Sequence, residues 1–235
     1  WSAPAPTPRP RSTRWSGATA TTSCRCTRPW CSTRVGAAGA VVQLHRGVAQ
    51  AVVGGNATQA ARLVELQAQV GQALREGDAV DARDGAALGT AGVWKALRED
   101  WSAVQAKAVS VGADESFRLH TAYIERVRDF ITSIADRSNA MLDPELETFY
   151  LMDVFVVRLP ALIEDAGRLR AQGASQAARQ GQSAAERIDM TVMLRRLQDA
   201  RTAIETALRK AGSQDAALRT KLAGAGEALD ASLDA

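Results

Sequence analysis

A few charged and aromatic side chains lie on the apolar faces of amphipathic segments, where they could bind a small polar molecule. Arg46 is flanked by Leu44 and Val48, and Asp153 shares a helical face with Tyr150. A guanidinium can hold a carboxylate or a nitrate through two hydrogen bonds. An ionised carboxylate is costly to bury without a partner. The pattern therefore predicts either a ligand site or buried ion pairs between helices.

Asp153 has four candidate partners. These are Arg46, Arg126, Arg158 and, through water, a backbone carbonyl near Pro160. A structural ion pair that fixes helix register is the plainer interpretation of both Asp153 and Arg46. A Tyr at helical spacing is also an ordinary core position. The candidate ligand-binding residues are Arg46, Tyr150, Asp153 and Arg158.

The two histidines, His45 and His120, could form a metal pair or a pH sensor. No third ligand can be identified, so we expect hydrogen-bonded core histidines with a structural or signalling role. The three cysteines have C-x-C spacing and no fourth ligand, which fits zinc poorly: Cys24, Cys26 and Cys31. We therefore predict no metal and no cofactor.

Catalytic motifs are missing from the sequence. It contains no G-x-S-x-G, H-E-x-x-H or C-x-x-C, and no strand followed by a glycine-rich phosphate loop. The Glu-x-x-His motif of a di-iron bundle is also absent. We therefore predict no catalytic residue and no enzyme.

Residues 1–37 differ in composition from the rest of the chain. Residues 1–34 hold five of the seven Pro and all three Cys, but no Leu, Ile, Val, Met or Phe. Such a segment can bury little apolar surface, so we expect it to be irregular or disordered. Its composition is also typical of a GC-rich coding region read out of frame, and our hypothesis is that the authentic frame resumes near Gly36 to Val42.

The charge of the chain is unevenly distributed. The net charge is +3, but residues 1–34 carry six Arg and no acidic residue, which leaves 23 basic and 26 acidic side chains in the remaining 201 residues. A mildly acidic body has no basic face to offer to phosphates. We therefore predict no nucleic-acid partner.

The remaining chain, residues 38–235, has the pattern of long amphipathic helices. Apolar residues recur at intervals of three and four in six stretches, which are 40–74, 93–104, 116–134, 146–173, 175–211 and 215–234. Gly54 to Asn56 interrupts the first, which is either one long helix with a weak point there or two helices. Glu76 to Asp78 ends this unit, and residues 78–91 read as a loop with a short helical turn. We predict an all-α fold, an elongated antiparallel bundle of five or six helices.

Proline marks two positions along this pattern. Asp143 and Pro144 have the order of an N-cap followed by the first residue of a helix. Pro160 falls inside the next helix and removes the hydrogen bond to the carbonyl of Val156, so we expect a kink there. A kinked helix is also an element that could shift during signalling.

The segment from Ser138 to Arg170 resembles the extracytoplasmic sensor region shared by bacterial methyl-accepting chemotaxis receptors, sensor histidine kinases and diguanylate cyclases. The motifs that carry the resemblance are Leu142-Asp143-Pro144, Tyr150-Leu151-Met152-Asp153 and Arg158-Leu159-Pro160. Gln43 to Gly47 is similar to the Q-x-HRG element of the same family, and residues 40–235 are covered in all. Ala140-Met141 and Phe149 depart from the pattern. The HRG element is also similar, more loosely, to that of nitrate- and nitrite-sensing helical domains.

The resemblance implies a ligand-sensing periplasmic domain of a transmembrane receptor, with chemotaxis as the expected output and a cyclase or a kinase as the alternative. It implies a small molecule or small anion as ligand, pairing of two copies through their first helices, and membrane contact only through flanking spans that this chain lacks. The chain would then be a receptor fragment that stops before the second span. The alternative is a non-catalytic helical module for protein interaction or oligomerisation, which an exposed apolar stripe would favour.

Overall fold

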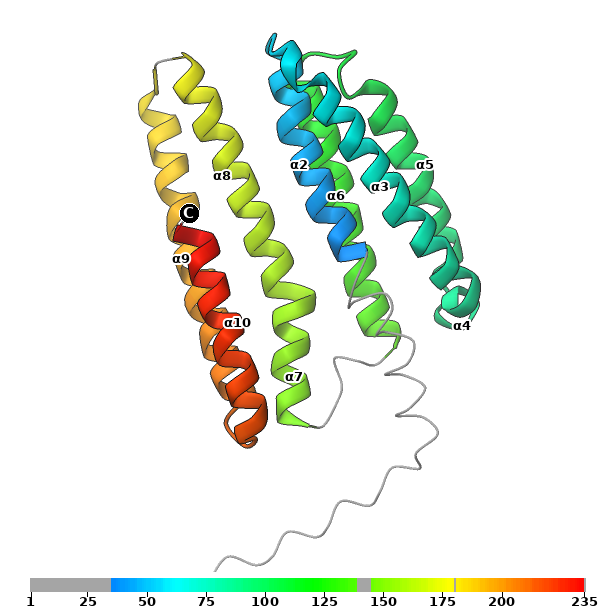
Figure 1. Ribbon diagram of the computed structural model, residues 1–235, viewed down its shortest axis with the longest axis vertical. Coiled ribbons are helices and arrows are strands. Elements are labelled where there is room, and N and C mark those ends of the chain that lie inside the picture. The colour runs from blue at the N-terminus through cyan, green and yellow to red at the C-terminus, as the bar shows by residue number, and fades with distance from the viewer. Residues whose placement is uncertain (1–34, 139–144, 180, 235) are drawn as a thin grey trace, which may run out of the picture.

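The computed structural model describes residues 35–138, 145–179 and 181–234 (Figure 1). In these residues the regular structure is helical throughout, with no strand, so the all-α prediction is confirmed. Seven helices have 17 or more residues, which is one more than the upper predicted number: α2 Val35–Val53, α3 Ala60–Val80, α5 Ala91–Lys107, α6 Ala113–Arg137, α8 Leu159–Arg179, α9 Ala184–Ala211 and α10 Ala216–Asp234. The shorter elements are η2 Ala57–Gln59, η3 Asp81–Gly85, α4 Ala86–Leu88, α7 Leu146–Met152 and η5 Asp153–Arg158.

The long helices lie side by side in two groups (Figure 1). Helix α2 packs on α3 and α6, and α6 packs on α5, which makes the first group. In the second group, α9 lies between the column formed by α7, η5 and α8 and the last helix, α10. The two groups are joined where α8 contacts α2 and where η5 contacts α6.

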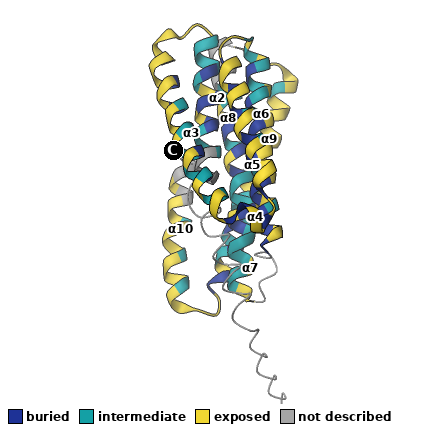
Figure 2. Ribbon diagram, turned by 90° about the vertical axis from the view of Figure 1, so that its right-hand side faces the viewer, coloured by how far each residue is buried: buried dark blue, intermediate teal, exposed yellow. Residues whose placement is uncertain are grey.

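Each group has an apolar core, and Val156 of η5 packs into the core of the first group. Trp94, Trp101 and Phe130 belong to the core of the first group, as the spacing of the two tryptophans predicts. The second core is built around Leu162 and Ile204. The outer surface of α10 and the first half of α9 are exposed (Figure 2).

The first helical unit continues beyond its predicted end. Gly54 to Asn56 separates α2 from α3 as expected, but α3 runs through Gly77 to Val80, and most of residues 78–91 are helical. Gly77 is buried, and a Cβ atom there would lie 2.3 Å from carbons of the Trp94 ring. The glycine therefore allows α5 to approach α3 and does not end the helix.

Replacing Gly77 with Ala is expected to lower the free energy of unfolding by about 1–3 kcal/mol, because the new methyl group overlaps the Trp94 ring. Gly71 provides a matched control on the same helix, where an added Cβ has only the Arg75 side chain nearby, at 3.5 Å. Gly71→Ala is expected to stabilise the protein by about 0.5–1 kcal/mol. Chemical denaturation of both variants measures this difference, and equal effects of the two substitutions would contradict it.

Other helix boundaries also differ from those predicted. Helix α2 begins at Val35, slightly before the predicted boundary at residue 38. Helix α8 passes through Gly173 and reaches Arg179, and α9 begins after Ser183, which forms a capping box with Glu186. Asp143 and Pro144 lie outside the described residues.

Pro160 lies near the start of α8, directly after the π-helical segment η5. The backbone N–H of Leu159 donates to the carbonyl of Val154, five residues back, as in a π turn. Proline has no N–H to donate, and its ring crowds the preceding turn of an α-helix. The wider turn of η5 relieves this crowding, and it also carries two of the predicted ligand-binding residues, Asp153 and Arg158.

Candidate functional site: an open groove between α7–η5 and α9

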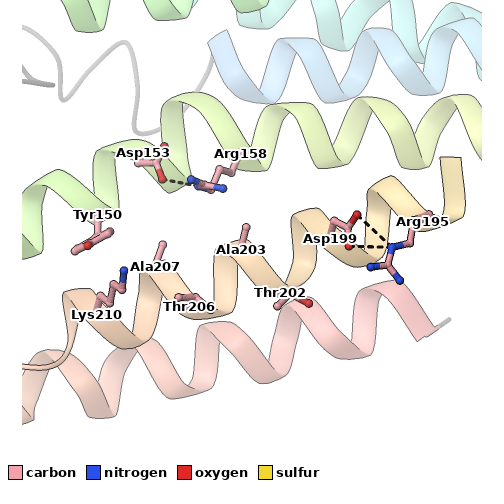
Figure 3. A pocket seen from close by; sticks show the side chains of 10 residues that line it. All are labelled: Tyr150, Asp153, Arg158, Arg195, Asp199, Thr202, Ala203, Thr206, Ala207 and Lys210. Atoms are coloured by element: carbon pink, nitrogen blue, oxygen red, sulfur yellow. Dashed lines mark hydrogen bonds and ion pairs between the residues drawn. The ribbon is translucent and has the colours of Figure 1, made fainter. Parts of the chain in front are cut away.

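Three of the four predicted ligand-binding residues line one open groove of about 460 Å³ (Figure 3). Tyr150 comes from α7, and Asp153 and Arg158 come from the two ends of η5. The opposite wall is one face of α9, whose residues recur at intervals of one, three and four. They are Arg195, Asp199, Thr202, Ala203, Thr206, Ala207 and Lys210.

Four of the five charged side chains in the groove neutralise one another in pairs. Asp153 pairs with Arg158 across η5, and Arg195 pairs with Asp199 along α9 with an N–O distance of 3.1 Å. Of the four candidate partners of Asp153, Arg158 is therefore the one that pairs with it in the structure. Residues five apart lie about 140° apart around an α-helix, but a π turn brings them toward one face, so the pair in η5 depends on the π-helical backbone.

Lys210 is the remaining charged side chain of the groove. It forms no ion pair with any described residue, and its Nζ atom lies over the Tyr150 ring, 5.2 Å from the ring centre. Figure 3 shows Lys210 and Tyr150 facing each other from α9 and α7 at one end of the groove. The groove thus has one positive charge in excess.

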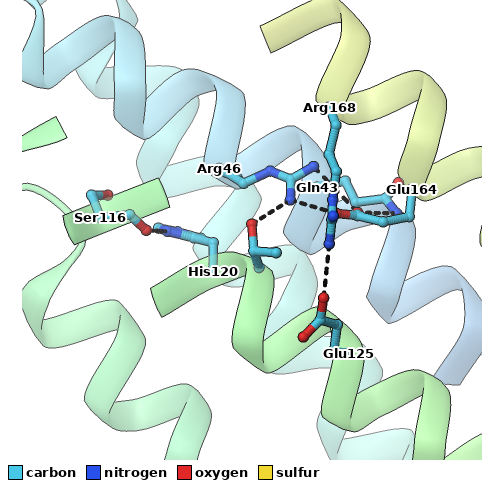
Figure 4. Close-up of polar contacts among 8 residues, drawn as sticks. Gln43, Arg46, Ser116, His120, Glu125, Glu164 and Arg168 are labelled. Atoms are coloured by element: carbon cyan, nitrogen blue, oxygen red, sulfur yellow. Dashed lines mark hydrogen bonds and ion pairs between the residues drawn. The ribbon is translucent and has the colours of Figure 1, made fainter. Parts of the chain in front are cut away.

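The fourth predicted residue, Arg46, lies outside this groove. Its side chain is 1% exposed and forms a two-pronged ion pair with Glu164 of α8, with N–O distances of 2.8 and 3.2 Å (Figure 4). Arg46 also donates to Thr121 of α6 and lies over the Phe117 ring. The structure therefore supports the interpretation of Arg46 as one half of a buried ion pair between helices.

Glu164 is the central acceptor of this cluster, which joins three helices. It accepts from Gln43 at 3.0 Å and from Arg168 at 2.6 Å, in addition to Arg46, and Arg168 in turn pairs with Glu125 of α6. Gly167 makes room for the cluster, because a Cβ there would lie 3.2 Å from the Arg46 guanidinium. With two cations and two anions, the cluster is neutral and its central charges are fully paired.

His45 and His120 form a buried hydrogen-bonded pair. Their Nδ1 and Nε2 atoms are 2.8 Å apart, and the Nδ1 atom of His120 lies 2.6 Å from the carbonyl oxygen of Ser116. Since a carbonyl only accepts, His120 carries its proton on Nδ1 and accepts at Nε2 from the Nδ1–H of His45. The Nε2 atom of His45 has no hydrogen-bond partner among the described residues. In the structure, His45 and His120 are therefore hydrogen-bonded core histidines.

Both histidines are neutral at pH 7. Burial, and then the neighbouring His120, lower the pKa of His45 to about 4. Burial also lowers the pKa of His120, and the hydrogen bond to Ser116 partly opposes this effect. In this chain the pair does not titrate near neutral pH as a sensor would require.

Stability is expected to fall as the pH falls from 7 to 5. An unfolded histidine titrates near pH 6.5, so in this window the unfolded chain binds more protons than the folded chain. The pKa of about 4 for His45 corresponds to a loss of about 2 kcal/mol between pH 7 and 5. Denaturant unfolding at the two pH values measures the loss. His45→Gln, which can still donate to His120, is expected to reduce it, and an unchanged loss in this variant would contradict the assignment to His45.

The residues that the sequence analysis missed lie mostly on α9 and α8. The residues of the α9 wall are about 50 positions from their partners, and nothing local to α9 marks them as part of a site. Glu164 has no local signal either, because it lies about 200° around the helix from the buried Leu162 and is followed by a second acid, Asp165.

Comparisons with protein-family models, with curated proteins and with solved structures found no match. None of the described helices is long and apolar enough to span a bilayer. The described residues also contain no group of three or more potential metal ligands.

Proposed function

We propose that this chain is the ligand-sensing region of a bacterial transmembrane receptor, on the periplasmic side of the membrane. The observation that best supports this function is that Tyr150, Asp153 and Arg158, predicted from a motif as ligand-binding residues, line one solvent-accessible groove. Chemotaxis is the output we propose, with a diguanylate cyclase or a histidine kinase as the alternative. In the parent receptor two copies pair, and membrane spans flank the bundle.

The groove is connected to the rest of the bundle through one helical column. Its wall η5 continues directly into α8, and α8 is fastened to α2 by Glu164 and Arg46. A molecule that binds in the groove beside the Asp153–Arg158 pair excludes water from it, and so changes the strength of an ion pair that favours the π turn. The turn can then move along the column or revert to α-helix, which displaces the residues it passes by about 1.5 Å.

Such a mechanism needs a ligand that binds one of two helix packings better than the other. The boundary between the two groups is suited to a small shift, because it joins two separate apolar cores partly through polar contacts. The shift reaches α2, the first described helix, through the Arg46 cluster. Displacements of 1–2 Å between packed helices are a known form of signalling transition.

Thermal unfolding of the full chain with nitrate, nitrite, amino acids and organic acids tests this function. A compound at 100 times its dissociation constant should stabilise the fold by about 2.7 kcal/mol, which raises Tm by about 5–10 °C. Hydrogen exchange in the same samples should change in residues 153–179. A panel in which no compound raises Tm would count against a sensor.

The interaction module is the second candidate, and exposed apolar side chains on the first half of α9 favour it. Ile188 and Val192 lie four residues apart on one face and are more than half exposed, and residues 184–200 include no buried side chain. Such a stripe is typical of a surface that packs against another protein. Concentration-dependent self-association without any response to the panel would support this candidate over the sensor.

A further inference from the structure

We propose that the groove between α7–η5 and α9 binds a small organic monocarboxylate, with the carboxylate held at the Lys210 end. This inference rests on the proposed function, because it names the ligand class of the same groove. The charge of the groove, its unused hydrogen-bond donors and the small side chains on its α9 wall favour such a ligand.

The charge of the groove selects a ligand with one negative charge. Arg158 and Arg195 already have carboxylate partners, and Lys210 alone has none among the described residues. A monoanion beside Lys210 neutralises the groove, whereas a cation would add to the excess positive charge. A second negative charge on the ligand would have to displace Asp153 or Asp199 from its arginine.

Hydrogen-bond donors that can serve a carboxylate lie near the same end. Tyr150 has no hydrogen-bond acceptor among the described residues, and Thr206 accepts from Arg209 but keeps its own hydroxyl hydrogen. The ammonium group of Lys210 has three hydrogens and only the face of the Tyr150 ring beneath it. A carboxylate has two oxygens and about four acceptor positions, so it can use all three donors.

Two small residues on the α9 wall of the groove leave room for an organic tail. Ala203 and Ala207 present only methyl groups on α9, opposite η5. A tail that runs along these methyl groups from Lys210 leads toward the Asp153–Arg158 pair. An inorganic anion could use the donors but would leave this apolar strip in contact with water.

Titration calorimetry of the full chain with three probes tests the inference at constant ionic strength. The probes are butanoate, its neutral isostere butanamide, and nitrate. We expect butanoate to bind and the other two to show no binding. Lys210→Gln is expected to weaken butanoate binding at least tenfold, because it removes a charged hydrogen-bond donor. Lys221→Gln removes the same charge from an exposed position on α10 and is expected to leave binding unchanged.

The outcomes separate this inference from the proposed function. If nitrate binds and butanoate does not, the ligand is not a carboxylate, but the proposed sensor function still stands. Equal binding of butanoate to the wild type and to Lys210→Gln would overturn the site. Binding as expected, but with no change in hydrogen exchange over residues 153–179, would support the ligand class and count against the sensing mechanism. If butanoate does not bind, the inference about the ligand class is wrong. The proposed sensor function is tested separately, by thermal unfolding with nitrate, nitrite, amino acids and organic acids.

Discussion

Replacing Glu164 with Ala is expected to lower the free energy of unfolding by about 3–5 kcal/mol, because it leaves a buried guanidinium without its counter-charge. Arg46 is 1% exposed and would keep only the hydroxyl of Thr121 and the face of the Phe117 ring. Gln43 and Arg168 lose an acceptor at the same time. Thermal unfolding should show a decrease in Tm of about 10 °C.

Two further variants distinguish the cost of leaving a buried charge unpaired from the smaller cost of losing any ion pair. Glu65→Ala breaks the exposed pair with Arg62, whose side chains are 48% and 61% exposed, and is expected to change stability by less than about 1 kcal/mol. Combining Arg46→Met with Glu164→Met removes both buried charges and is expected to recover most of the lost stability. An effect of Glu164→Ala no larger than that of Glu65→Ala would show that the buried pair contributes little.

Deletion of a single residue is expected to have opposite consequences in η5 and in α8. A π turn contains one residue more than the α-helical turn it replaces, so deleting Phe155 should convert η5 to α-helix and leave the flanking helices in register. The Phe155 side chain is 52% exposed, so little packing is lost. Deleting Ala161 instead turns the following residues by about 100°, which moves Glu164 away from Arg46.

Circular dichroism and thermal unfolding distinguish the two deletions. We expect the Phe155 deletion to unfold cooperatively, with a Tm about 5–10 °C below that of the wild type because an α-helical turn restores the crowding by Pro160, and the Ala161 deletion to lose cooperative unfolding. The Phe155 deletion should also lose the hydrogen-exchange response of residues 153–179 to any compound that raises the wild-type Tm, because the π turn has been removed. A Phe155 deletion that unfolds like the Ala161 deletion would argue against a π turn that can revert to α-helix.

Periodicity predicted most of the helices, because apolar spacing depends only on neighbouring residues. It gave the wrong end for α3, where Gly77 was interpreted as a helix terminator. The true reason for that glycine is the Trp94 ring on α5, a contact that no local pattern reveals. The π segments were missed for a similar reason, since spacing rules assume α-helix throughout.

The candidate site was half predicted. Tyr150, Asp153 and Arg158 stand in one motif, whereas the other wall is formed by α9 residues from the opposite side of a helical hairpin. Apart from Ala203 and Ala207, those residues are polar and mostly exposed, so in sequence they resemble any solvated helix face. The sequence offered Arg46 as a ligand-binding residue or as an ion pair, and only the position of Glu164 in space decides between them.

The two separate cores have a consequence for how the molecule loses its structure. A chain whose halves are each built around their own apolar cluster is a candidate for two cooperative units, each able to open at its own free energy. The fully paired charges around Glu164, together with Val156 of η5, which packs in the first core, then link the two units so that they unfold together. Weakening both the charges and the Val156 contact should allow α8, α9 and α10 to melt before the tryptophan-rich bundle, as a separate and earlier transition.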